Sequence, residues 1–142
     1  MVQSVRYEKS CGIIIVNNNK ILLLHYPSGH WDFPKGHVDG SETEQETAQR
    51  ELFEETAIEK FIFIDGFREA TQYNYRRSRH LYQKKVVYFL GTTSINSIQI
   101  SSEHQGFGWF AWKEAHQQIT FENSRTILHA AERFWNSDAC SA

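Results

Sequence analysis

The chain has 142 residues, of which 14% are aromatic and 40% belong to the hydrophobic set. This composition excludes a disordered chain and predicts a single globular domain over residues 1–142 with a sizeable core. A formal net charge of −2 excludes a general attraction to nucleic acid or membranes, so a polyanionic ligand needs local cations or a metal. No apolar run is long enough for a membrane span or signal peptide, and we expect a cytoplasmic monomer.

The first third of the chain predicts a β-hairpin followed by a short strand. Gly12–Val16 and Lys20–His25 are apolar runs separated by Asn17–Asn19, and Asn tolerates the positive φ of tight turns. Because the runs are continuously apolar, we expect strands that are covered on both faces. Residues 26–29 predict a turn, and residues 31–34 predict a short strand.

A helix is predicted from Thr43 to Thr56, with Ser41 or Thr43 as its N-cap. We expect its glutamates to face a solvent-filled cleft. Its apolar side, which we expect to face a sheet, carries Ala48, Leu52 and Phe53.

The second half of the chain predicts strands at Phe61–Ile64, Lys85–Leu90 and Phe107–Trp112, and a closing helix at Ser124–Trp135. The polar and basic stretch at residues 68–83 is interpreted as a long loop or an irregular hairpin. Strands arranged around a central helix predict an α/β fold, an α/β/α sandwich.

The two cysteines, Cys11 and Cys140, have no metal-ligand spacing. Cys11 opens an apolar strand and is expected to be a buried free thiol, whereas Cys140 lies in an expected frayed tail.

The predicted central helix carries Glu51, Glu54 and Glu55 at positions i, i+3 and i+4, so all three project from one face. These like charges repel one another, and folding alone does not require them. Hard oxygen ligands on one face are what Mg²⁺ or Mn²⁺ binds, and either ion would offset the repulsion. The plainer alternative is a solvated acidic helix face.

The segment from Gly36 to Ile58 resembles the signature of the Nudix hydrolases, and we call it the Nudix box. The positions that carry the resemblance are Gly36, Glu42, Arg50, Glu51, Leu52, Glu54, Glu55 and Ile58. Ala57 departs from it because the family usually has Gly there, so we expect a slightly different helix ending. The resemblance implies a Nudix-type α/β/α sandwich with a mixed central sheet and metal-dependent hydrolysis of phosphoanhydrides.

The resemblance also implies roles for the residues of the Nudix box. Glu54 and Glu55 are the expected metal ligands, together with the carbonyl group of Gly36. Glu51 either shares a metal or accepts a proton from the attacking water, and its role as the base is a hypothesis. Arg50 is expected to orient a glutamate rather than touch the substrate, and Glu42 is expected to pair with Arg50.

A further acidic residue, Glu103, stands in the sequence Ser102-Glu103-His104 ahead of Trp109. It is either a solvated loop carboxylate or a distal metal ligand or base, and the resemblance favours the functional alternative. His104 either contacts phosphate or caps the loop.

The segments that flank the box are similar to those of the asymmetrical diadenosine tetraphosphate hydrolases. They are Cys11–Ile14, Trp31–Val38, Gly66–Phe67, Lys85–Leu90 and Ser102–Trp109. This likeness implies a dinucleoside polyphosphate substrate that water splits into a nucleoside triphosphate and a monophosphate, without a covalent intermediate. Candidate phosphate-binding cations are Lys35, His37 and Lys84, and the candidate base-stacking rings are Tyr73 and Phe121.

Other functions remain open at this stage. The basic run Arg76–His80, flanked by Tyr73, Tyr75 and Tyr82, suits single-stranded nucleic acid and would favour an RNA 5′-pyrophosphohydrolase. A diphosphoinositol polyphosphate hydrolase is a third possibility. A non-catalytic nucleotide-binding module is disfavoured, because the acids of the box and Arg50 are all present.

Overall fold

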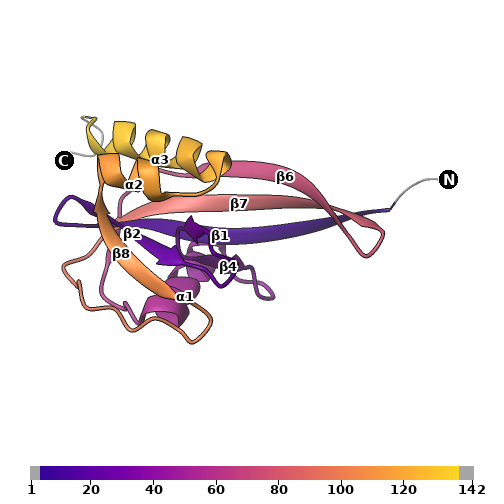
Figure 1. Ribbon diagram of the computed structural model, residues 1–142, viewed down its shortest axis with the longest axis horizontal. Coiled ribbons are helices and arrows are strands. Elements are labelled where there is room, and N and C mark those ends of the chain that lie inside the picture. Colours follow the sequence, from indigo (N-terminus) through magenta and orange to yellow (C-terminus); the bar gives the residue numbers. More distant parts are fainter. Residues whose placement is uncertain (1–3, 138–142) are drawn as a thin grey trace.

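The computed structural model describes residues 4–137, whose strands form one eight-stranded sheet (Figure 1). The strands are β1 (Val5–Asn17), β2 (Lys20–His25), β3 (Trp31–Asp32), β4 (Lys35–His37), β5 (Ile62–Phe63), β6 (Glu69–Arg77), β7 (His80–Thr92) and β8 (Gly106–Ala111). The helices are α1 (Glu44–Thr56), α2 (Trp112–Gln118) and α3 (Glu122–Trp135). The path of neighbours is β3-β2-β1-β7-β5, with β4 on β1, β6 on β7 and β8 on β2.

The sheet is mixed and is covered by helices on both faces. Strands β1 and β7 pair in parallel, whereas the other pairs are antiparallel. Helices α2 and α3 lie on one face and α1 on the other (Figure 1). The expected α/β/α sandwich with a mixed central sheet is therefore confirmed.

The second half of strand β1, from Cys11 to Val16, is buried and is apolar without alternation. Ile14 and Val16 pack in the core beneath α2 and α3, whereas Ile13 and Ile15 pack in the core beneath α1. Successive side chains of a strand point to opposite faces, so a strand between two helical layers needs apolar residues at every position.

The hairpin between β1 and β2 confirms the prediction made from the asparagines. Asn18 and Asn19 have φ angles of 51° and 61°, and a two-residue turn with positive φ at both positions matches the twist of the flanking strands.

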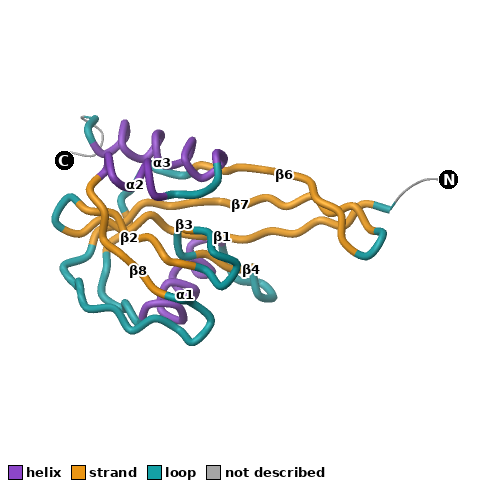
Figure 2. Tube along the Cα trace, in the orientation of Figure 1, coloured by secondary structure: helices purple, strands orange, loops and turns teal. Residues whose placement is uncertain are grey.

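The stretch at residues 68–83 corrects a sequence prediction. It is neither a loop nor irregular: it forms β6 and the start of β7, joined through Ser78 and Arg79 with φ angles of 51° and 68° (Figure 2). Sequence reasoning missed the regular hairpin for two reasons. Most of β6 is exposed, so it lacks a strongly apolar face, and its turn lacks the Asn-Gly type of signal.

Helix α1 begins where the sequence predicts. Its N-cap is Thr43, whose hydroxyl accepts from the Glu46 amide while the Glu46 carboxylate accepts from the Thr43 amide. Ala48 and Leu52 are buried against the sheet as expected. Phe53, however, is 46% exposed, because it lies one residue and about 100° around the helix from Leu52.

Two further boundaries differ from the sequence prediction. Trp112, expected to end the last strand, begins α2, which the sequence did not reveal. Helix α3 starts at Glu122, two residues before the predicted start, and buries Ile127, Leu128 and Ala131. Both helices pack their apolar residues onto the sheet.

Cys11 is fully buried and free, as expected, whereas Cys140 lies outside the described residues. No helix within residues 4–137 is long and apolar enough to cross a membrane.

Helix α1 ends at its C-cap, Ala57, where the sequence predicts an altered helix ending because glycine is missing. The structure shows the usual ending instead. Ala57 itself adopts the left-handed conformation, with φ 66° and ψ 13°, and its amide donates to the Phe53 carbonyl at 2.8 Å. The helix thus ends with the geometry that glycine would give. The side chain of Ala57 makes this conformation unfavourable by about 1–2 kcal/mol.

We predict that Ala57→Gly stabilises the protein by about 1 kcal/mol, because glycine adopts positive φ without a steric penalty. Urea unfolding at equilibrium measures this change. The matched control is Ala130→Gly inside α3, where the same substitution should destabilise by about 1 kcal/mol. Destabilisation by both substitutions would contradict the strain at Ala57.

Candidate active site

Arg50 organises the acidic face of α1. Its guanidinium donates twice to Glu42, from Nε at 2.7 Å and from Nη2 at 3.0 Å. Its Nη1 donates to Glu51 at 2.9 Å and to Glu54 at 3.2 Å, and its Nη2 also donates to the His37 carbonyl at 2.9 Å. Arg50 therefore orients glutamates, as the sequence predicts.

Glu42 pairs with Arg50, which also confirms the sequence prediction. The Arg50 hydrogen bond, assisted by the amide of Asp39 and the hydroxyl of Thr47, lowers the pKa of Glu42 to about 2. This carboxylate is therefore ionised throughout the physiological range, and it fixes Arg50 at the start of the acidic face.

Glu55 is the buried member of the acidic set, which corrects the expectation that all of these glutamates face solvent. Its side chain is 9% exposed and accepts from the Lys35 backbone amide at 3.2 Å. Burial, together with the charges of Glu51 and Glu103, raises its pKa to about 9. A carboxyl group in this position is protonated near neutral pH unless a cation is bound beside it.

Gly36 lies on β4 where the strand passes over α1. A Cβ atom at this position would overlap the carboxyl group of Glu51. Burial, opposed by Arg50 and reinforced by the charges of Glu54 and Glu42, raises the pKa of Glu51. The absence of a side chain at Gly36 is therefore what allows Glu51 to lie against the backbone of β4.

The loop between β7 and β8 brings Glu103 to the same site. Its backbone caps the end of α1: the Ser101 amide donates to the Glu55 carbonyl, and the Gln99 amide donates to the Thr56 carbonyl, both at 3.1 Å. Glu103 is exposed, and its charge contributes to the raised pKa of Glu55. The Nudix box and the distal acid are therefore close enough to interact electrostatically.

His104 forms a hydrogen bond within the loop between β7 and β8. Its Nδ1 lies 2.9 Å from the Ser101 hydroxyl, its side chain is 3% exposed, and its Nε2 lies 3.8 Å from Glu55. Burial lowers its pKa, although the charge of Glu103 opposes this. Of the two roles that the sequence leaves open, this geometry fits the loop cap.

The donor set fits a hard divalent cation. Glu51, Glu54, Glu55 and Glu103 offer carboxylate oxygens, and Gly36 offers a carbonyl oxygen. Burial and mutual repulsion act against ionisation of Glu55, and a cation would offset both effects. In the described chain, Arg50 Nη1 holds Glu51 and Glu54 together, while the Lys35 amide holds Glu55.

A cavity of about 580 Å³ lies beside the acidic site. Its walls come from β3, β4, β6, β7 and the start of α3, and the lining includes four of the five predicted substrate-binding residues, Lys35, Tyr73, Lys84 and Phe121. His37 does not line the cavity. It is exposed at the end of β4, and its role in substrate binding stays a prediction.

The two lysines of the cavity differ in their partners. Lys35 Nζ donates to the fully buried Asp32 at 2.7 Å. Lys84 has no carboxylate within ion-pair distance in the described part of the chain, and burial and the charge of Lys35 lower its pKa. Of the two lysines, Lys84 is therefore the one whose charge is not paired with a described carboxylate.

Sequence reasoning missed several residues that line the cavity, notably His30, Asp32 and Tyr88. His30 packs against Phe121 with ring centroids 5.0 Å apart and stacks on Tyr26 at 4.7 Å. A lone histidine after a turn gives no signal of this kind. For Asp32 the sequence did offer a signal: Asp32 and Lys35 place two opposite charges in and next to an otherwise apolar short strand.

Comparison with known proteins gives the family of this fold and site. The model of the NUDIX domain family matches residues 6–130. The chain belongs to the NUDIX family. It is 37% identical to the asymmetrical bis(5′-nucleosyl)-tetraphosphatase of Rattus norvegicus, over 89% of this chain and 94% of that protein.

Two other known proteins are similar to this chain. A solved structure of a C. elegans Ap4A hydrolase binary complex has a TM-score of 0.78 and 29% identity, covering 89% of this chain and 96% of that one. An RNA pyrophosphohydrolase of Legionella pneumophila is 29% identical over 92% of this chain and 84% of its own length. The predicted enzyme class, a Nudix phosphoanhydride hydrolase, is confirmed.

We predict that Gly36→Ala displaces Glu51, because the added methyl group needs the space of its carboxyl group. The expected result is a folded protein that is about 1–3 kcal/mol less stable and that takes up Mg²⁺ more weakly in calorimetry. The control is Gly106→Ala, where a Cβ atom meets nothing within 4 Å and both measurements should stay at wild-type values. Unchanged Mg²⁺ uptake in Gly36→Ala would contradict this role of Gly36.

Proposed function

We propose that this NUDIX hydrolase cleaves bis(5′-nucleosyl) tetraphosphates asymmetrically into a nucleoside triphosphate and a nucleoside monophosphate, with Mg²⁺ or Mn²⁺ as its cofactor. The observation that carries the proposal is the continuity between the cavity and the acidic site through Lys35. Its backbone amide donates to Glu55, and its side chain lines the cavity with Asp32. A phosphate chain that enters the cavity therefore leads directly to the carboxylates.

Two exposed aromatic rings in the cavity support a substrate that carries a nucleobase. Tyr73 is 39% exposed and Phe121 is 47% exposed, although rings of this size are more often buried. They come from β6 and from the residue before α3, so they reach the cavity from separate elements. Stacking on a nucleobase contributes about 1–3 kcal/mol per base.

Lys84 supports the binding of the phosphates. It lies opposite Tyr73 in the β6–β7 pairing, so a cation and a ring stand side by side on the wall of one cavity. Lysine acts as a point charge on phosphate. Among residues 4–137, Lys84 has no carboxylate partner of the kind that Lys35 has in Asp32. Tyr73 would hold the base and Lys84 the adjoining phosphates.

The acidic residues are assigned to the chemical step. A bound dication would be held by Glu54, Glu55 and the Gly36 carbonyl, and it would supply charge neutralisation on the phosphates. In this proposal Glu51 accepts a proton from the attacking water, and Glu103 is the alternative proton acceptor. Arg50 keeps Glu51 and Glu54 oriented, so it acts as a positioning residue.

We predict that Tyr73→Ala and Phe121→Ala each raise KM for diadenosine tetraphosphate by about 5- to 150-fold, which corresponds to the loss of about 1–3 kcal/mol of stacking. Steady-state kinetics measures this effect. The control is Phe107→Ala on β8, because Phe107 is as exposed as Tyr73 but lies outside the cavity. An equal rise in KM in the control, or no rise in either variant, would exclude base stacking by these rings.

The proposed reaction itself predicts the products of hydrolysis in heavy-oxygen water. Diadenosine tetraphosphate should give equal amounts of ATP and AMP, with the label in only one of the two, because water attacks a single phosphorus. Chromatography with mass spectrometry identifies both. Two molecules of ADP from each substrate would rule out asymmetrical cleavage.

One substitution tests whether the acidic site carries out the hydrolysis, and one competing substrate tests the substrate class. Glu51→Gln should lower turnover about 100-fold or more, whereas Glu59→Gln, an exposed acid just beyond the box, should leave it unchanged. Triphosphorylated RNA serves as the competing substrate. The basic run Arg76–His80 at the tip of the β6–β7 hairpin does not line the cavity, and we therefore do not favour RNA as the substrate. Faster turnover of RNA than of the dinucleotide would instead indicate an RNA pyrophosphohydrolase.

A further inference from the structure

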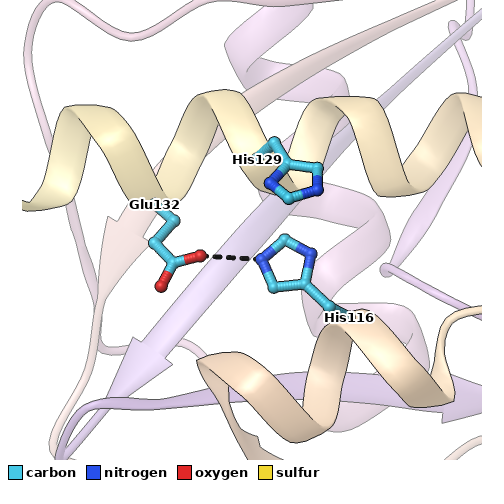
Figure 3. Close-up of side chains that lie close together, drawn as sticks. All are labelled: His116, His129 and Glu132. Atoms are coloured by element: carbon cyan, nitrogen blue, oxygen red, sulfur yellow. Dashed lines mark hydrogen bonds and ion pairs between the residues drawn. The ribbon is translucent and has the colours of Figure 1, made fainter.

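Three ligand-bearing side chains meet between α2 and α3, away from the acidic site and the cavity. His116 comes from α2, and His129 and Glu132 come from successive turns of α3 (Figure 3). One ligand atom of each lies within 4.8 Å of the others. His116 Nε2 and Glu132 Oε1 are 2.7 Å apart, and the two imidazole rings lie 4.2 Å apart between centroids, tilted by 31°.

The hydrogen bonding of this group is incomplete. An ionised carboxylate only accepts hydrogen bonds, so Nε2 of His116 donates to Glu132, and in the neutral imidazole Nδ1 then carries the lone pair. That Nδ1 is buried and has no hydrogen-bond partner in the described residues. A buried polar atom without a partner is unfavourable, so packing of α2 on α3 alone does not account for this arrangement.

We propose that His116, His129 and Glu132 form a binding site for a divalent transition-metal ion of the Zn²⁺ type, separate from the Mg²⁺ site of the Nudix box. Two imidazole nitrogens and one carboxylate oxygen suit Zn²⁺, whereas Mg²⁺ prefers oxygen ligands alone. His116 can ligate through the unpartnered Nδ1 while Nε2 stays bonded to Glu132, an arrangement that is common for metal-bound histidines. Alternatively it ligates through Nε2, with Glu132 as a direct ligand. His129 is exposed and gives the ion access from solvent.

The position of this site links it to the wall of the cavity. Arg125 of α3 donates from Nε to the His116 carbonyl at 2.8 Å, and it pairs with Glu122, which lines the cavity. A metal ion ligated by His116 of α2 and His129 of α3 would fasten the two helices together at the same junction. The proposed site therefore has a structural role, and it does not depend on which phosphate compound the enzyme hydrolyses.

The test is uptake of Zn²⁺ by untagged protein in excess Mg²⁺, which is added to compete with Zn²⁺ for the acidic site. Equilibrium dialysis with metal analysis should find one Zn²⁺ per chain, and the melting temperature should rise by about 5 °C at a large excess of Zn²⁺ over its dissociation constant. The substitution Cys140→Ser in all samples removes the thiol that could compete, since Cys11 is buried.

His129→Gln is the decisive variant, because the residue is exposed and its loss should not disturb the core. It should weaken Zn²⁺ uptake at least about tenfold and abolish the rise in melting temperature, as should Glu132→Gln. The controls are His80→Gln in the β6–β7 hairpin and Glu114→Gln, an exposed acid on α2, and both should bind Zn²⁺ as the wild type does. No Zn²⁺ uptake, or equal uptake by His129→Gln, would overturn the proposal. An anomalous Zn²⁺ peak found only at the Nudix box would do the same.

Discussion

The guanidinium group of Arg50 is the interaction on which the acidic site depends. It connects Glu42, just before α1, with Glu51 and Glu54 on the acidic face of α1, and with β4 through the His37 carbonyl. Because its side chain is 29% exposed, these pairs contribute less to stability than buried pairs of the same geometry would. Their main effect is directional. A planar group with five fixed donors sets the positions of several carboxylates at once, which a lysine could not do.

Strand β4 is only three residues long, yet each residue serves a different part of the site. Lys35 gives its amide to Glu55 and its side chain to the cavity, Gly36 leaves room for Glu51, and His37 gives its carbonyl to Arg50. The strand is anchored by antiparallel pairing with β1. Since the part of β1 that pairs with β4, Ser10–Gly12, is buried between the two helical layers, the three residues of β4 are held on the core of the sheet.

The parts of the structure that follow a strong period or a specific motif could be predicted from the sequence. The doubly covered strand β1, the Asn18-Asn19 turn, helix α1 and the pairing of Arg50 with Glu42 are of this kind. The β6–β7 hairpin was missed because its exposed strand is polar and its turn is Ser78-Arg79. The burial of Glu55 and the approach of His30 to Phe121 depend on how distant elements pack. Neither could be derived from spacing along the chain, because spacing does not fix which elements become neighbours.

The parallel pairing of β1 with β7 has a consequence for biogenesis. Val5 is paired with Leu81, and this register continues to Val16 with Thr92. During synthesis β1 therefore has no parallel partner until some 75 further residues have been added. At a ribosomal rate of about 5–20 residues per second, the apolar segment 11–16 stays without its main neighbour for several seconds. High contact order of this type slows folding. Strand β1 therefore cannot complete its pairing in the sheet until β7 has left the exit tunnel.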